Sequence, residues 1–137
     1  MIELVDIAYV RSGAADLAGA VRFATEVVGL EHVDGGEAGV AHLRADSRHH
    51  CLAFVEGVSG VIASAFTVDG PGALALAETE LESRGFAVWR GGAADARSRR
   101  VGELIGFDDP FGNRIELIQA GEGFRERRLR PDRPQAR

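Results

Sequence analysis

The chain has 137 residues, which is the size of one domain and is long enough to bury a hydrophobic core. Hydrophobic residues make up 45% of it and charged residues 27%, and no apolar run has the roughly 20 residues of a membrane span. The net charge of −5 divides into −9 for residues 1–124 and +4 for the last thirteen residues. An acidic body is unlike a nucleic-acid-binding surface, so we expect neither a nucleic-acid nor a membrane partner.

The single cysteine, Cys51, excludes an internal disulfide and a four-cysteine zinc site. The first ten residues lack the basic segment that opens a secretory signal peptide. We therefore expect a cytoplasmic protein. Residues 121–137 are rich in arginine, and we expect them to form a disordered tail.

In the first half, apolar and aromatic positions predict a strand over residues 2–11. A helix follows, with Asp16 as its N-cap and Gly29 in a left-handed conformation at its end. Further strands are predicted at 40–44 and 49–55. The predicted core-facing stripe of the helix is Leu17, Ala20, Val21, Ala24, Val27 and Val28.

The second half repeats this order. A strand at 61–68 leads into a helix that starts near Pro71 and ends at Gly85. Leu74, Ala77 and Leu81 share one face of this helix. The segments that follow are predicted as a strand at 86–89, a loop at 91–100, a strand at 101–107, a turn at 108–113 and a strand at 115–119.

The repeated order β-α-β-β-β predicts an α+β fold built from two modules, about 1–57 and 60–120, in one domain over 1–120. Neither module has enough strands to bury its own sheet. We expect the two to pair into one curved mixed sheet, a bowl with the helices outside. Its concave face is a place for a small molecule.

Two segments of the sequence carry a resemblance to a known family. The helix segment 22–30 and the closing segment FDDPFGNRIEL, 107–117, resemble the vicinal oxygen chelate superfamily of glyoxalases, bleomycin-resistance proteins and dioxygenases. The stretch LRADSRHH, 43–50, is similar to the N-terminal half of type I extradiol ring-cleavage dioxygenases. The resemblance implies the bowl-shaped fold. It also implies that the chain corresponds to the half of those enzymes that lacks the metal.

The resemblance places up to four His or Glu ligands for a divalent metal inside the bowl, and ring-cleaving members use two His and one Glu. The four positions fall on Tyr9, Ala53, Ala63 and Glu116 of this chain. Alanine offers no ligand atom, and a tyrosine side chain is a neutral phenol by default. We therefore predict that the usual metal site is absent and that no cofactor is bound.

The histidines offer a second set of ligand atoms. His49 and His50 are adjacent, so on a strand their side chains are expected to point to opposite faces and not to share one metal. His42 lies on the preceding strand and is able to approach one of them. The sequence is compatible with a His42–His50 pair that binds a metal and also with an ordinary hydrogen-bonded histidine at the end of a strand.

The function that we predict is binding of a small aromatic or apolar molecule in the bowl, without the usual metal, by a homodimer. The predicted lining side chains are Tyr9, Phe54, Phe66, Trp89, Phe107 and Glu116.

Three alternatives stay open. The first is a metal-dependent ring-cleaving dioxygenase or glyoxalase-type lyase or isomerase, which uses iron(II) or manganese(II) as a homodimer or with a separate catalytic partner. The second is an accessory subunit that pairs with a catalytic polypeptide. The third is a metal-free enzyme in which Tyr9 and Glu116 are the catalytic acid–base pair.

Overall fold

The computed structural model describes residues 1–121, 123 and 124. In this part of the chain, no helix has both the length and the apolar character needed to cross a membrane. The elements are β1 (Asp6–Ala14), α1 (Leu17–Arg22), the π-helix η1 (Phe23–Val28), β2 (Glu31–Val33), β3 (Val40–Arg44), β4 (Leu52–Glu56), β5 (Val61–Val68), α2 (Ala73–Ser83), β6 (Trp89–Arg90), α3 (Ala93–Arg99), β7 (Glu103–Asp108) and β8 (Arg114–Gln119).

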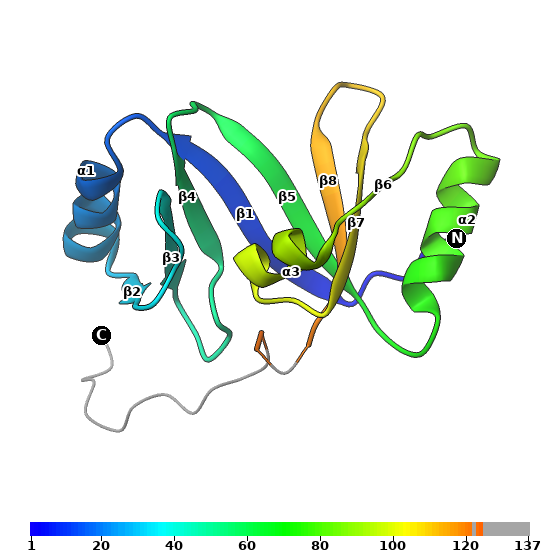
Figure 1. Ribbon diagram of the computed structural model, residues 1–137, viewed down its shortest axis with the longest axis horizontal. Coiled ribbons are helices and arrows are strands. Elements are labelled where there is room, and N and C mark those ends of the chain that lie inside the picture. The colour runs from blue at the N-terminus through cyan, green and yellow to red at the C-terminus, as the bar shows by residue number, and fades with distance from the viewer. Residues whose placement is uncertain (122, 125–137) are drawn as a thin grey trace.

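The eight strands form one sheet in the order β2-β3-β4-β1-β5-β8-β7-β6. Each half has the same arrangement, because β1 lies parallel to β4 and β5 lies parallel to β8. The two halves join where β1 pairs antiparallel with β5. The predicted α+β fold of two paired modules is confirmed. Figure 1 shows α1 and α2 at opposite ends of the sheet and α3 in front of its central strands.

The first helix begins and ends as predicted, but its buried face differs. The Asp16 side chain accepts a hydrogen bond from the Gly19 backbone at 3.0 Å, and Gly29 ends the helix with φ of 87°. Ala24 is buried, whereas Val27 and Val28 are 70% and 58% exposed. The predicted stripe therefore fails in the last turn, because a π-helix has more residues per turn and rotates these side chains away from the sheet.

The second module contains one helix that the sequence pattern missed. α2 forms where predicted and buries Leu74, Ala77 and Leu81. The predicted loop over 91–100 instead contains α3, whose start is held by a 2.8 Å hydrogen bond from the Gly92 backbone to Asp95. This helix buries one side chain, Ala96, so it has no apolar periodicity to detect.

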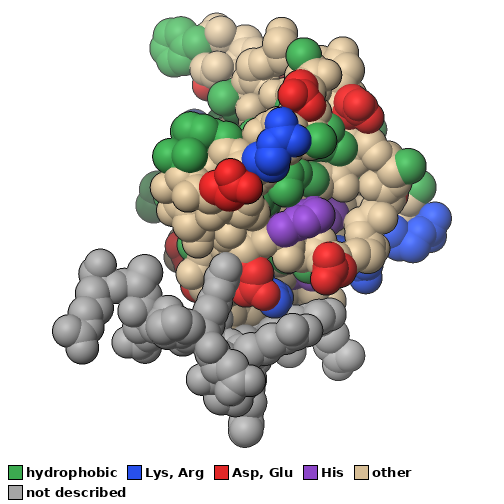
Figure 2. Space-filling model, turned by 90° about the vertical axis from the view of Figure 1, so that its left-hand side faces the viewer, with side chains coloured by type: hydrophobic (Ala, Val, Ile, Leu, Met, Phe, Trp, Pro, Cys, Tyr) green, Lys and Arg blue, Asp and Glu red, His purple; other side chains and the backbone are tan. Residues whose placement is uncertain are grey.

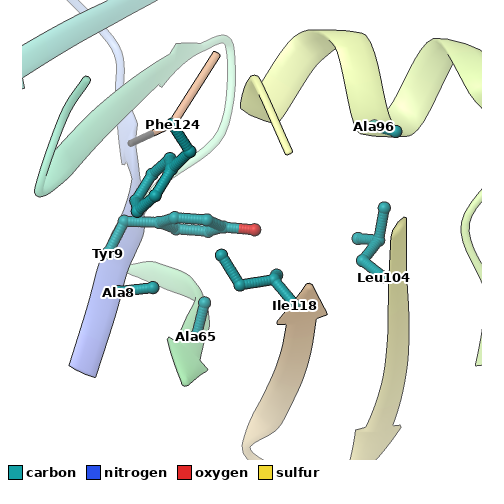
Figure 3. Close-up of a cluster of buried hydrophobic side chains, with 7 residues drawn as sticks. All are labelled: Ala8, Tyr9, Ala65, Ala96, Leu104, Ile118 and Phe124. Atoms are coloured by element: carbon teal, nitrogen blue, oxygen red, sulfur yellow. The ribbon is translucent and has the colours of Figure 1, made fainter. Parts of the chain in front are cut away.

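The core lies on both faces of the sheet. One cluster packs beneath α2, and the other packs between the opposite face and α3. Figure 3 shows Tyr9 in this second cluster, extending from β1 toward Ile118, with Phe124 on one side of its ring and Ala65 on the other. Phe124 is 2% exposed, so the expected tail contributes to the core at this position. The remaining predicted tail, 122 and 125–137, lies outside the described residues.

Candidate functional site

The four positions at which the resemblance implies metal ligands lie on neighbouring central strands. Tyr9 of β1 and Glu116 of β8 meet across β5, and Ala53 and Ala63 are the cross-strand neighbours of Arg11 on its two sides. Both alanines and the Tyr9 and Glu116 side chains are buried. Tyr9 and Glu116 are therefore in direct contact, and the other two positions, which lie beside Arg11, have no ligand atom.

The Glu116 carboxylate is already occupied by two protein partners. The Tyr9 hydroxyl donates a 2.5 Å hydrogen bond to Glu116 Oε1. From α3, Arg99 Nε donates to the same oxygen at 2.7 Å and Arg99 Nη2 donates to Oε2 at 2.8 Å. Arg99 and Glu116 thus form a bidentate, charge-assisted pair. The Arg99 side chain is 11% exposed and the Glu116 side chain 3%. Both carboxylate oxygens thus face donors and not an open ligand position.

The electrostatics of this network keep Tyr9 protonated. Burial first, then the charge and the hydrogen bond of Glu116, raise the pKa of the Tyr9 phenol far above its usual value. Burial lowers the pKa of Arg99, but the hydrogen bond and the charge of Glu116 outweigh it and the pKa is raised. Tyr9 is therefore a neutral donor and not a phenolate ligand, and the residues at the position do not fit the metal that the family binds.

The aromatic side chains predicted to line the bowl divide between the two faces of the sheet. Phe66 and Phe107 pack in the cluster beneath α2. Phe54 follows Ala53 on β4 and so points to the face opposite Ala53. Trp89 is 37% exposed and lies beside Arg99, whose Cζ is 5.8 Å from its ring centroid. Of the expected lining residues, Tyr9, Glu116 and Trp89 therefore share one face of the sheet. The three phenylalanines lie on the opposite face, because successive side chains of a strand alternate between faces.

Three histidines form a second cluster. Ring nitrogens of His42, His49 and His50 lie within 4.8 Å of one another, and all three residues are buried. The Nδ1 atoms of His49 and His50 are 2.8 Å apart. The expectation that these two side chains point to opposite faces is wrong. β4 begins at Leu52, so the alternation of a strand does not apply to residues 49 and 50.

The segment that carries His49 and His50 is fixed by the preceding arginine. Arg48 Nη2 donates to Asp46 at 2.7 Å, and Arg48 Nη1 donates to the carbonyl oxygen of Ile7 on β1 at 2.6 Å. The Arg48 side chain therefore closes the turn between β3 and β4 and ties it to the central strand. The histidines then face the bowl beside Tyr9. The Tyr9 ring stacks on the His50 ring, with 5.0 Å between the ring centroids.

Two of the histidine rings, those of His42 and His50, are held in their neutral form. Burial, and then the charge of Arg11, lower the pKa of His42 to about 4. Burial, and then the neighbouring His42 and His49, lower the pKa of His50 to about 2. At neutral pH both rings therefore carry a free lone pair, which is the form that binds metals or accepts hydrogen bonds.

A cleft of about 650 Å³ opens beside this cluster. Its walls are the loop before β3, the C-terminal half of α3, the segment that precedes β7 and the segment that follows β8. His42 forms part of its lining. The other lining residues are Gly35, Gly36, Glu37, Ala96, Arg97, Ser98, Arg100, Val101, Gly102, Gly121 and Gly123.

Residues 6–117 match the family model of the Glyoxalase/Bleomycin resistance protein/Dioxygenase superfamily. The chain belongs to this superfamily. It is 30% identical over 135 residues to the 1,2-dihydroxynaphthalene dioxygenase of Sphingobium xenophagum, and the match covers 98% of this chain and 45% of that protein. It is 28% identical over 129 residues to the iron-dependent extradiol dioxygenase of Rhodococcus jostii (strain RHA1), covering 93% of this chain and 43% of that one.

Solved structures agree with the sequence matches. A crystal structure of catechol 2,3-dioxygenase superposes with a TM-score of 0.80 and 27% identity, over 88% of this chain and 40% of that one. The resemblance predicted from the sequence is therefore confirmed at the level of the superfamily. The chain spans about half the length of the curated relatives, 45% and 43% in the two cases above.

Proposed function

We propose that this chain is a module of an extradiol-dioxygenase-type protein that supports ring cleavage by a metal-bearing module and does not cleave the ring itself. One observation carries the proposal: at the family's metal position, the Glu116 carboxylate is taken by Tyr9 and Arg99. Two of the other positions that the resemblance implies are Ala53 and Ala63, whose side chains hold no ligand atoms. The names of the relatives support the reaction class, and their greater length leaves room for a second, metal-bearing pair of modules.

The chain's own residues then act as a scaffold. Arg99 and Tyr9 neutralise and hold the buried Glu116 charge, and this ties α3 to β1 and β8. The concave face is closed by packing of α3 and Phe124 over the central strands. Such a filled bowl gives a rigid body on which another module is able to dock.

The direct test is ring-cleavage activity of the purified chain supplied with iron(II), catechol and dioxygen under conditions that detect a single turnover. We expect no ring-opened product. The matched variant combines Tyr9→His, Ala63→His and Arg99→Met, which frees Glu116 and supplies two imidazoles. We expect this variant to bind one more equivalent of iron(II) than the unaltered chain. Turnover by the unaltered chain that Glu116→Gln abolishes contradicts the proposal.

We also propose small-molecule binding as a second role, located in the cleft beside His42 and not on the aromatic side chains first expected. The cleft volume and the buried His42 ring at its wall support this role. A catechol is the first ligand to test, by its effect on the melting temperature. We expect catechol to raise the melting temperature of the unaltered chain and of the His32→Asn variant. We expect no such rise in the Ser98→Trp variant, because the tryptophan fills the cleft. A rise of equal size in the Ser98→Trp variant contradicts this location.

We propose that the chain forms a homodimer through η1. Phe23, Val27 and Val28 of this helix are 59%, 70% and 58% exposed, which favours a protein contact over solvent. Figure 2 faces the α1 side of the molecule and shows hydrophobic patches between acidic and basic side chains. Light scattering on a sizing column is expected to give twice the chain mass, and Val27→Glu is expected to return it to the monomer mass. A monomer mass for the unaltered chain contradicts the dimer.

A further inference from the structure

We propose that His42, His49 and His50 form a binding site for one nitrogen-preferring transition-metal ion, such as zinc(II), cobalt(II) or nickel(II). This site is separate from the family's metal position at Glu116. It also goes beyond the proposed supporting function, which needs no ion in this chain.

The geometry suits a three-histidine site. The ring nitrogens lie within 4.8 Å of one another, and one pair is 2.8 Å apart. Nitrogen ligands at zinc–nitrogen distances of 2.0–2.1 Å around a tetrahedral ion are separated by about 3.3 Å. The observed separations therefore bracket the required one, and ring rotations bring the nitrogens onto a common ion.

Two of the rings have an unused nitrogen in the interior. His42 Nε2 and His50 Nε2 have no hydrogen-bond partner among the described residues, although the two residues are 2% and 0% exposed. Buried polar atoms of this kind are costly unless a partner satisfies them. A bound ion takes one nitrogen from each ring. At His42 Nε2 and His50 Nε2 it provides that partner, and the contact between His49 Nδ1 and His50 Nδ1 is then free to remain.

The cleft supplies a route to the cluster and leaves room for a further ligand. His42 lines it, so an ion in solution reaches the cluster from that side. Arg11 lies next to His42 in the sheet register, with Ala53 between them, and its buried Nη1 has no partner among the described residues. Its positive charge opposes a bare dication and favours one that carries an anionic oxygen ligand. The fourth ligand that this site would take is therefore an anion such as hydroxide or a carboxylate.

The ligand set also selects the metal. Three imidazoles suit zinc, cobalt, nickel and copper, whereas magnesium and calcium prefer oxygen ligands. We therefore expect cobalt(II) and zinc(II) to compete for the site and magnesium(II) to leave it empty.

The test is a cobalt(II) titration of the full chain without a histidine tag, followed by visible absorption. We expect one equivalent with a tetrahedral spectrum that zinc(II) abolishes and magnesium(II) leaves unchanged. His42→Asn and His50→Asn are each expected to weaken binding at least tenfold. The matched control is His32→Asn, because His32 is the one histidine of the sequence outside the cluster and is exposed on β2. It is expected to bind cobalt(II) as the unaltered chain does.

Several outcomes overturn the site: no cobalt bound by the unaltered chain, full binding by both cluster variants, or loss of binding in His32→Asn. Circular dichroism shows whether the His50→Asn variant folds. If it does not, His42→Asn and His42→Gln decide the question, because that residue lies at the cleft wall. Binding that Glu116→Gln abolishes while both cluster variants retain it overturns this inference and the proposed function together. Loss in the cluster variants alone leaves the proposed function intact.

Discussion

Arg99 determines the chemistry of Glu116, because it supplies two of the three donors that surround the carboxylate. The sequence around Tyr9 and Glu116 does not predict that Arg99 binds this carboxylate. The family resemblance assigns both residues to the bowl, and the structure has them in contact. Arg99, however, comes from a segment that carries no helical pattern. Its role follows from a tertiary contact seventeen residues away along the chain, which local spacing does not encode.

Arg99→Met is expected to lower the free energy of unfolding by about 3–5 kcal/mol, because it leaves a buried carboxylate without its counter-charge. The double variant Arg99→Met, Glu116→Gln is expected to recover most of this loss, since no charge is then buried. Urea unfolding curves of the two single variants and the double variant measure the coupling. Strictly additive losses would show that the two side chains do not act as a pair.

Tyr9 is the single tyrosine of the sequence, so alkaline titration reports on it alone. Its folded pKa is raised above the unfolded value of about 10. Above that pH the unfolded chain binds fewer protons than the folded chain, so stability falls as the pH rises. We expect no phenolate absorbance until the chain unfolds, and a shallower alkaline loss of stability in Tyr9→Phe. Phenolate absorbance from folded protein near pH 10 is the contrary result.

At the scale of elements, two of the predicted strands have the bounds that the structure shows. The strand at 61–68 and the strand at 40–44 lie where the pattern put them. The composition of residues 49–51 predicts a strand, but β4 begins only at Leu52, after the turn that the Arg48 side chain ties to β1. The sequence leaves a His42–His50 pair open but does not predict His49 beside it, because a three-residue error in a strand boundary changes which way two side chains point.

The connection between the modules depends on a close backbone approach at the end of β1. The Gly13 amide donates to the carbonyl oxygen of Gly60 at 2.8 Å, and a Cβ atom at Gly13 would lie 2.5 Å from the Ser59 backbone nitrogen. Gly13→Ala is therefore expected to cost about 1–3 kcal/mol through overpacking. Gly92→Ala is the control, because its Cβ would have 3.6 Å to the nearest atom. Equal melting temperatures of the two variants would contradict the close approach.

The whole molecule is expected to unfold as one unit. β1 is hydrogen-bonded to β4 of its own module and to β5 of the other, so neither module keeps its sheet when the other opens. The single tryptophan, Trp89, reports on the second module by fluorescence, and far-ultraviolet circular dichroism reports on both. The two probes are expected to give the same midpoint in urea. Separate midpoints would show that the modules are independent.

The packing of α3 over the bowl has an evolutionary consequence. The Ala63→His side chain would have to enter a position beside Arg11 that is 1% exposed. Loss of Arg99 would leave the buried Glu116 carboxylate without its positive partner. Each single substitution toward an iron-binding triad therefore destabilises the chain before any affinity for iron appears. Acquisition of ring-cleaving chemistry by this module would therefore need several substitutions together, because each of them alone lowers the stability of the fold.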